Sequence, residues 1–197
     1  TVYEKALDGL PGSESIAELA EAYLKEDGSL DKQIDDLIFW QAAKTAASGF
    51  VTGLGGMITL PVAIPADLTA TLYVQLRMCG AIAYMKGYDV KDDRVKTFIF
   101  ACICGSQVTS VLKKAGVDIG KKLTARMIKS ISQEMLLKIN QTIGFRLVTK
   151  AGSKGIANMA KLVPVAGGII NGGLNGAETK VVGEAAKKVF NENSAVK

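Results

Sequence analysis

The sequence predicts an all-α protein, a single compact multi-helix bundle with glycine-rich, closely packed helices. Three observations favour this class. Apolar residues recur with the three-to-four-residue period of a helix along much of the chain. No segment alternates apolar and polar residues for long, as a half-buried strand would. Glycine is frequent, at 21 of 197 residues, whereas proline is limited to 4, so the glycines are not those of a linker or a collagen-like repeat.

The first 44 residues predict two acidic helices. Ser15 and Glu18 have the spacing of a capping box, in which each side chain accepts a hydrogen bond from the backbone N–H of the other residue. Apolar residues then recur at helical spacing until Gly28, a residue type that commonly follows the end of a helix. Ser29 can cap a second helix, whose apolar residues again fall on one stripe.

The next predicted helix, over about 66–85, is the most apolar. Pro65 favours a helix start, because proline fits the first helical position, and Gly87 marks the end. Apolar residues lie nearly all round this helix, so we expect it to be central and buried. Asp67 and Arg77 interrupt the apolar sequence, and each needs a partner if buried. The expected partner of Arg77 is Asp89 or a helix end.

Helices are also predicted over most of the second half of the chain. Asp92 and Asp93 favour a helix start, because acidic residues are stabilised at helix N-termini, and this helix is expected to run to Gly116. The remaining predictions are a basic helix over about 118–129, short helices over about 132–150 and 153–162, and a final helix over about 165–190. No linker divides the chain, so the acidic N-terminal helices (1–44) and the helical core (45–197) are expected to form one continuous domain.

Glycines spaced four residues apart predict close helix packing. Gly168, Gly172 and Gly176 follow this spacing within the last predicted helix. Such a row lets another backbone approach closely, and that contact compensates for the ~1 kcal/mol that each glycine costs a helix relative to alanine. We expect internal packing between helices; self-association and insertion into a bilayer are the alternatives.

One uncharged run is long enough to be compared with a membrane span. It extends from Thr45 to Ala66, 22 residues, and a spanning helix needs about 20. Pro61 and Pro65 would break such a helix, so a helix end and a turn are expected instead. The sequence starts without the basic and apolar regions of a signal peptide, and its three cysteines cannot pair off completely. We therefore expect a cytoplasmic protein; the alternative is a cytoplasmic protein that binds peripherally to a membrane.

The net charge of +5 is distributed unevenly. Residues 1–36 sum to −7, residues 37–90 to +1 and residues 91–197 to +11. This asymmetry favours an acidic N-terminal part folded against a basic C-terminal part, or an anionic partner such as a membrane surface. Nucleic acid is a disfavoured partner, because aromatic residues are not interleaved with the basic ones.

Basic residues crowd one region of the second half. The candidates for binding an anionic surface are Lys114, Lys121, Lys122, Arg126 and Lys129. On an amphipathic helix they would form a cationic face suited to anionic lipid or an acidic partner. An ordinary solvated face over a core stripe is the alternative interpretation.

The residue types exclude much common catalytic machinery. The chain contains no histidine, which removes Ser-His-Asp and Cys-His nucleophiles and imidazole zinc sites. Cys102 and Cys104 are two residues apart on a predicted helix, about 200° apart around its axis, so they cannot ligate one metal ion. The segment from Gly116 to Lys122 departs from the phosphate-loop pattern. No cofactor and no metal site is predicted, and the sequence favours a protein that is not an enzyme.

Several segments together resemble the EcsC family. They are Thr52–Gly56, Leu60–Leu68, Gln75–Arg77, Ala83–Asp89, Val163–Gly168, Thr179 and Gly183–Ala186. The resemblance implies a helical protein, cytosolic or membrane-peripheral, similar to a bacterial protein associated with an ABC-transporter operon tied to secretion. It brings no catalytic residues. The positions that match the family pattern, and form our candidate shared site, are Asp67, Gln75, Arg77, Tyr88 and Asp89.

The leading functional hypothesis is a non-enzymatic helical protein that docks on a membrane or on a membrane protein or transport system. The uncharged middle, the basic second half and the glycine spacing favour it. Three alternatives remain: a carrier of an apolar ligand such as a lipid, an enzyme that uses Asp67 and Arg77, and a toxin or immunity role in bacterial competition. The sequence does not determine an oligomeric state.

Overall fold

The computed structural model describes residues 7–9, 14–52, 66–118, 123–144 and 164–190. Every regular element within these residues is a helix, which confirms the predicted fold class. The helices are α2 (Ile16–Leu24), α3 (Leu30–Thr52), α4 (Ala66–Met85), α5 (Asp93–Cys102), η1 (Gly105–Gln107), α6 (Val108–Lys114), α7 (Ala125–Lys129), a helix over 133–144, and α9 (Pro164–Val189). The predicted short helix over 153–162 lies outside the described residues.

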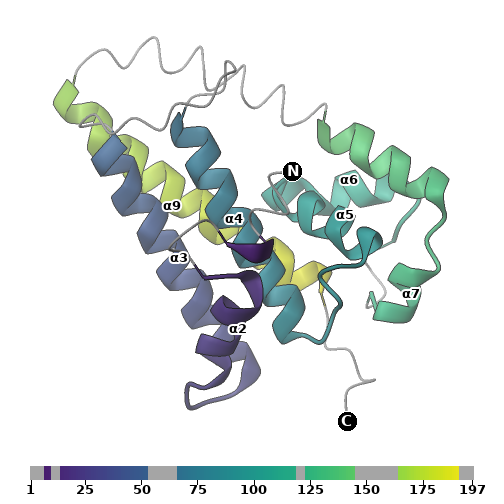
Figure 1. The fold of residues 1–197 in the computed structure, drawn as a ribbon. Coiled ribbons are helices and arrows are strands. Elements are labelled where there is room, and N and C mark those ends of the chain that lie inside the picture. The colour runs from purple at the N-terminus through teal and green to yellow at the C-terminus, as the bar shows by residue number, and fades with distance from the viewer. Residues whose placement is uncertain (1–6, 10–13, 53–65, 119–122, 145–163, 191–197) are drawn as a thin grey trace.

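Three long helices, α3, α4 and α9, lie side by side and form the centre of the fold (Figure 1). Helix α3 runs antiparallel to α9, since Asp35 lies against Lys187 and Thr45 lies against Thr179. Helix α4 runs parallel to α9, since Gln75 lies against Thr179 and Cys79 lies against Val182. Helix α2 packs on α4, whereas α5 contacts both α4 and α9 from the side that also carries α6 and α7. One hydrophobic core connects all these elements.

Helix α2 begins with the predicted capping box. The Ser15 hydroxyl accepts from the Glu18 N–H at 3.1 Å, and the Glu18 carboxylate accepts from the Ser15 N–H at 2.7 Å. Two backbone donors that the first helical turn leaves free are satisfied in this way. The hydrogen bonds from Ser15 lower the pKa of Glu18, because they favour the ionised carboxylate.

Ser15→Ala is expected to destabilise the protein by ~1 kcal/mol, as measured by chemical denaturation at pH 7, because the Glu18 N–H then loses its acceptor.

The Glu18 carboxylate of the capping box gives the stability of the protein a distinct pH dependence. A folded-state pKa below the unfolded one means that its stabilisation is present above the unfolded pKa and is lost as pH falls through the folded pKa. Chemical denaturation of the wild type and Glu18→Gln between pH 7 and pH 3 checks this: the two stabilities should converge in acid. A constant difference would contradict the assignment.

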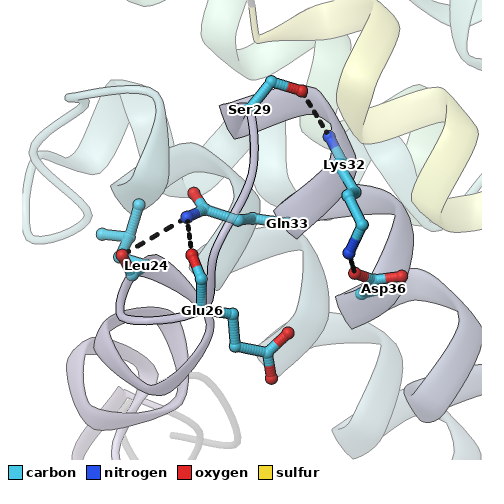
Figure 2. A network of polar contacts seen from close by, with 6 residues as sticks. All are labelled: Leu24, Glu26, Ser29, Lys32, Gln33 and Asp36. Atoms are coloured by element: carbon cyan, nitrogen blue, oxygen red, sulfur yellow. Dashed lines mark hydrogen bonds and ion pairs between the residues drawn. The ribbon is translucent and has the colours of Figure 1, made fainter.

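The turn between α2 and α3 is stabilised by a side chain that the sequence patterns did not identify. Figure 2 shows that the Gln33 amide nitrogen donates to the carbonyl oxygens of Leu24, at 3.3 Å, and Glu26, at 2.6 Å. Gly28 adopts a φ of 133°, which a side chain would disfavour. The predicted cap on α3 is present, because the Ser29 hydroxyl accepts from the Lys32 N–H at 3.3 Å.

The predicted continuous helix from 92 to 116 was wrong in its middle. Asp92 does cap the start, accepting from the Arg94 N–H at 2.7 Å. However, the chain turns at Gly105, whose φ is 56°, and the α5 and η1–α6 directions differ by 119°. A β-carbon at Gly105 would lie 3.2 Å from the Val181 side chain of α9. The bend therefore packs the glycine backbone directly onto α9.

The predicted basic helix over 118–129 was too long. Gly116, with a φ of 88°, ends the preceding helical segment, and the Thr124 hydroxyl caps α7 by accepting from the Met127 N–H at 3.3 Å. Because the cap residue is extended, α7 cannot begin before Ala125. Residues 119–122, with two of the predicted cationic residues, lie outside the described part of the chain. The predicted helix over 132–150 is described over 133–144.

Glycines let the long helices approach closely, as predicted. A β-carbon at Gly176 would lie 3.1 Å from the Ala42 carbonyl oxygen of α3. At Gly183 it would lie 2.7 Å from Ile38, and at Gly80 it would lie 2.5 Å from Ile16 of α2. Gly176 was one of the predicted small positions, and it serves internal packing.

Candidate functional site

The structure places the candidate shared residues of α4 in different surroundings. Gln75 is fully buried and faces α9. Arg77 is two residues further along, which is about 200° around the helix axis, and it faces the segment before α2. Asp67 lies in the first turn of α4, and its side chain is not among those described. Gln75 and Arg77 therefore lie on different faces of α4.

Arg77 contacts Glu14, in the segment just before α2, rather than the expected Asp89. Its Nη2 donates to the backbone carbonyl oxygen of Glu14 and lies 3.9 Å from the Glu14 carboxylate. Its guanidinium carbon is 5.6 Å from the centre of the Tyr73 ring, within the range of a cation–π contact. These contacts hold the cation against α2 and away from Asp89.

Tyr88 and Asp89 have local structural contacts. Tyr88 is buried; its hydroxyl donates to the Leu123 carbonyl oxygen at 2.7 Å, and its ring packs edge-on against Phe190 at 5.1 Å. The Asp89 side chain is exposed and accepts from the Lys91 N–H at 2.9 Å, which stabilises the turn between α4 and α5. Both residues therefore stabilise the local structure around the turn between α4 and α5.

Three buried polar side chains form what we call the polar seam: Thr45 of α3, Gln75 of α4 and Thr179 of α9. The Thr45 and Thr179 hydroxyl oxygens are 3.0 Å apart, and the Gln75 amide nitrogen donates to the Thr179 hydroxyl at 3.2 Å. Three helices are thereby joined by side-chain hydrogen bonds in the core. Of the candidate shared residues, only Gln75 takes part.

A cleft of about 470 Å³ lies between the start of α5 and the helix over 133–144. Its lining consists of Lys91, Asp92, Asp93, Arg94, Thr97, Gln133, Leu136, Leu137 and Asn140. Both acidic residues are engaged, Asp92 with the Arg94 N–H and Asp93 with Lys96 at 2.9 Å. The Arg94 Nε donates to the Ile131 carbonyl oxygen at 3.3 Å. The charged and amide lining suits a polar ligand better than an apolar one.

The helix register brings three nearly uncharged stretches to the same end of the bundle. They are residues 45–52 of α3, 66–76 of α4 and 164–177 of α9, and together they contain one charged residue, Asp67. We call this part the uncharged end; it is the upper end of α3, α4 and α9 in Figure 1. Lys44 of α3 and Glu178 of α9 adjoin this end, whereas the ion pair of Asp35 and Lys187, at 2.6 Å, lies toward the other end.

An exposed aromatic pair lies on α3 just before the uncharged end. Phe39 is 63% exposed and Trp40 54% exposed, and their ring centres are 5.5 Å apart in an edge-on arrangement. The adjoining Lys44 is also exposed. Large apolar side chains that remain in solvent side by side commonly mark a contact surface. The sequence contains a signal for this pair, because two large aromatic residues lie off the apolar stripe of the helix. They were not among the predicted site residues.

Other candidate groups lie elsewhere. Lys114, Arg126 and Lys129 of the predicted cationic surface are exposed, while Lys121 and Lys122 are outside the described residues. Cys102 is buried, and burial together with the adjacent Cys79 thiol raises its pKa, so it stays a thiol. In the part of the chain that the structure describes, no three His, Cys, Asp or Glu side chains are grouped as a metal site.

Comparison with known proteins agrees with the resemblance in the sequence. The model of the EcsC protein family matches residues 2–192, nearly the whole chain. The chain belongs to the EcsC family. The match includes the acidic N-terminal helices, which lie before the motifs that carry the resemblance.

A curated relative of this EcsC-family chain is the uncharacterized protein YdbA of Bacillus subtilis (strain 168). The two are 30% identical over 146 residues, which cover 72% of this chain and 49% of YdbA. The chain thus spans about half the length of that relative. No solved structure matches it. Among the described helices, none is both long and apolar enough to cross a membrane alone; α5 and the η1–α6 segment pass this test only as a sharply bent pair.

Proposed function

We propose that this EcsC-family chain is a non-enzymatic, membrane-peripheral protein that inserts its uncharged end into one leaflet of a bilayer. The observation that carries the proposal is the convergence of three uncharged helix stretches beside the exposed aromatic pair. Tryptophan is favoured at membrane interfaces because its ring is apolar while its N–H still reaches water. The aromatic pair would then lie at headgroup level, with the uncharged end below it.

The dimensions of the uncharged end suit one leaflet. At 1.5 Å per residue, the uncharged stretch of α3 is about 12 Å long and that of α9 is about 21 Å long. The hydrocarbon core of a bilayer is about 30 Å thick, so both stretches are too short to cross it, at about 0.4 and about 0.7 of its thickness. Trp40 precedes the uncharged stretch by five residues, or about 7.5 Å along the axis. This spacing supports shallow insertion, with Trp40 and Lys44 among the headgroups.

Charge favours an anionic bilayer. Lys44 is exposed next to the uncharged end, and a long basic side chain can extend toward phosphates while its methylenes remain in apolar surroundings. In sequence, residues 145–163, which lead into α9, contain four Lys or Arg and no Asp or Glu. Each basic residue near an anionic surface contributes about 1 kcal/mol. We therefore expect anionic lipids to bind more strongly than zwitterionic ones.

The other hypotheses from the sequence receive less support. For an enzyme built on Asp67 and Arg77, the arginine is already bonded to Glu14. For a carrier of an apolar ligand, the cleft beside α5 has a charged lining. Docking on a membrane protein would use the same uncharged end, and the test below separates it from lipid binding because the vesicles contain no protein.

Vesicle flotation tests the proposal. The full chain should float with vesicles of phosphatidylcholine and phosphatidylglycerol, and less with phosphatidylcholine alone. Part of the binding should be lost between 50 and 500 mM salt, because the electrostatic contribution is screened. Trp40 is the single tryptophan, so its emission should shift to shorter wavelength when the aromatic pair enters the interface. Absence of flotation with both vesicle types at low salt would refute lipid docking.

A further inference from the structure

Two parts of the chain carry opposite charges of equal size. Residues 14–36 contain eight acidic and two basic residues and sum to −6, whereas residues 91–144 contain four acidic and ten basic residues and sum to +6. Among the described residues, no ion pair joins these two parts. The predicted contact of acidic N-terminal with basic C-terminal residues is found in α9 instead, at the ion pair of Asp35 and Lys187. Both parts therefore present much of their charge to solvent.

The acidic part includes a turn between α2 and α3 that projects from the bundle (Figure 1). Glu26, Asp27 and Asp31, which we call the acidic turn, are exposed, and none of them forms an ion pair with a described residue. The Gln33 amide fixes the backbone of the turn, and Figure 2 shows the Glu26 carboxylate pointing away from that amide. A fixed backbone lowers the conformational entropy that is lost when a partner binds.

The basic part presents a hollowed surface. The cleft beside α5 is lined by Lys91 and Arg94, and neither forms an ion pair within the part of the chain that the structure describes. The bond from Arg94 to the Ile131 carbonyl oxygen places the residues that follow α7 next to this cleft. Arg126 and Lys129 of α7 are exposed and likewise form no ion pair with described residues. We call these four cationic residues the basic surface.

We propose that the acidic turn of one copy of this chain docks on the basic surface of a second copy, so that the protein self-associates. The equal and opposite charges provide electrostatic complementarity, and a projecting turn is suited in shape to a cleft. Besides the cations, the amides of Gln133 and Asn140 in the cleft lining can donate hydrogen bonds to carboxylates. Neither surface includes residues of the uncharged end, so this self-association is independent of the proposed membrane docking.

The contact joins two different surfaces, which determines how copies assemble. A dimer formed through one such contact still has one free acidic turn and one free basic surface. Further copies can therefore add until a ring closes. Because the attraction is electrostatic and both surfaces are exposed, we expect the association to weaken as salt is added.

Sedimentation velocity on the full chain tests the proposal. At about 50 mM salt the average sedimentation coefficient should rise with protein concentration, and at about 500 mM salt it should remain that of a monomer. Glu26→Lys with Asp27→Lys reverses the acidic turn, and Lys91→Glu with Lys129→Glu reverses the basic surface. Each double variant should associate on the order of tenfold more weakly than the wild type at low salt. All four side chains are exposed, so both variants should remain folded.

A mixture of the two double variants tests the pairing of the surfaces. The unchanged basic surface of one variant can bind the unchanged acidic turn of the other, so the mixture should associate at low salt although neither variant does so alone. Lys180→Glu with Lys188→Glu, at exposed positions of α9, lowers the net charge as the basic-surface variant does and should associate like the wild type. A wild type that is monomeric at low salt would overturn the proposal and leave the basic surface to a different acidic molecule. Association that both reversal variants retain, or a mixture that stays monomeric, would also overturn it.

Discussion

Changing both Phe39 and Trp40 to serine is expected to weaken vesicle binding by about 70-fold, or ~2.5 kcal/mol at room temperature. The two side chains each expose about half of their area, roughly 100 Å² apiece, and burial contributes about 25 cal/mol per Å². Full burial of both side chains would contribute about 5 kcal/mol to the free energy of vesicle binding, and partial burial at the interface contributes roughly half of that. Both side chains are more than half exposed in the folded protein, so the variant should remain folded.

Flotation measures this effect, and a matched control separates it from a general loss of hydrophobicity. Leu24, 39% exposed, is the last residue of α2, a helix that lies away from the uncharged end of α3, α4 and α9 (Figure 1). Leu24→Ser should bind vesicles as the wild type does. Phe39→Ser alone keeps Trp40 and should show a smaller emission shift. Equal loss of binding in Leu24→Ser and in the double variant would contradict docking through the aromatic pair.

The sequence predicted helices well where one short-range interaction determines an end. Ser15 with Glu18, and Gly87 after α4, are such signals, because their hydrogen bonds form within four residues of the helix terminus. The bend at Gly105 could not be predicted in this way. A glycine in an apolar helical pattern is compatible with a continuous helix, and the preference for a turn comes from contact with Val181, 76 residues later in the sequence.

For the candidate site, the sequence predicted a set of residues but not their arrangement in space. Gln75 and Arg77 share a motif, but the helical repeat directs them to opposite sides of α4, toward α9 and toward the start of α2. The polar seam could not be found from the sequence, because Thr45 and Thr179 are 134 residues apart and neither is unusual in its local sequence. The uncharged stretches were visible in the sequence, but only the antiparallel register of α3 and α9 shows that they meet.

That register depends on glycine positions, so Gly183→Ala is expected to destabilise the protein by about 1–2 kcal/mol. The new β-carbon would lie 2.7 Å from Cγ1 and 2.9 Å from Cγ2 of Ile38. A β-branched side chain on a helix has essentially one favoured rotamer, so Ile38 cannot turn away. Overpacking costs about 1–3 kcal/mol, and the higher helix propensity of alanine returns up to about 1 kcal/mol. For a chain of this length, the melting temperature should fall by about 3–6 °C.

Gly144 supplies the matched control for this substitution. It too lies in a helix, but a β-carbon there would meet no atom within 4 Å. Gly144→Ala should therefore stabilise the protein by about 0.5–1 kcal/mol through helix propensity alone. Combining Gly183→Ala with Ile38→Ala removes Cγ1, Cγ2 and Cδ1, the three atoms that the new β-carbon would meet, so the pair should be less destabilising than the sum of the single changes. Thermal unfolding of the wild type, the three single variants and the double variant measures these differences. If both Gly183→Ala and Gly144→Ala are stabilised, α9 does not approach α3 as closely at Gly183 as the contact with Ile38 requires.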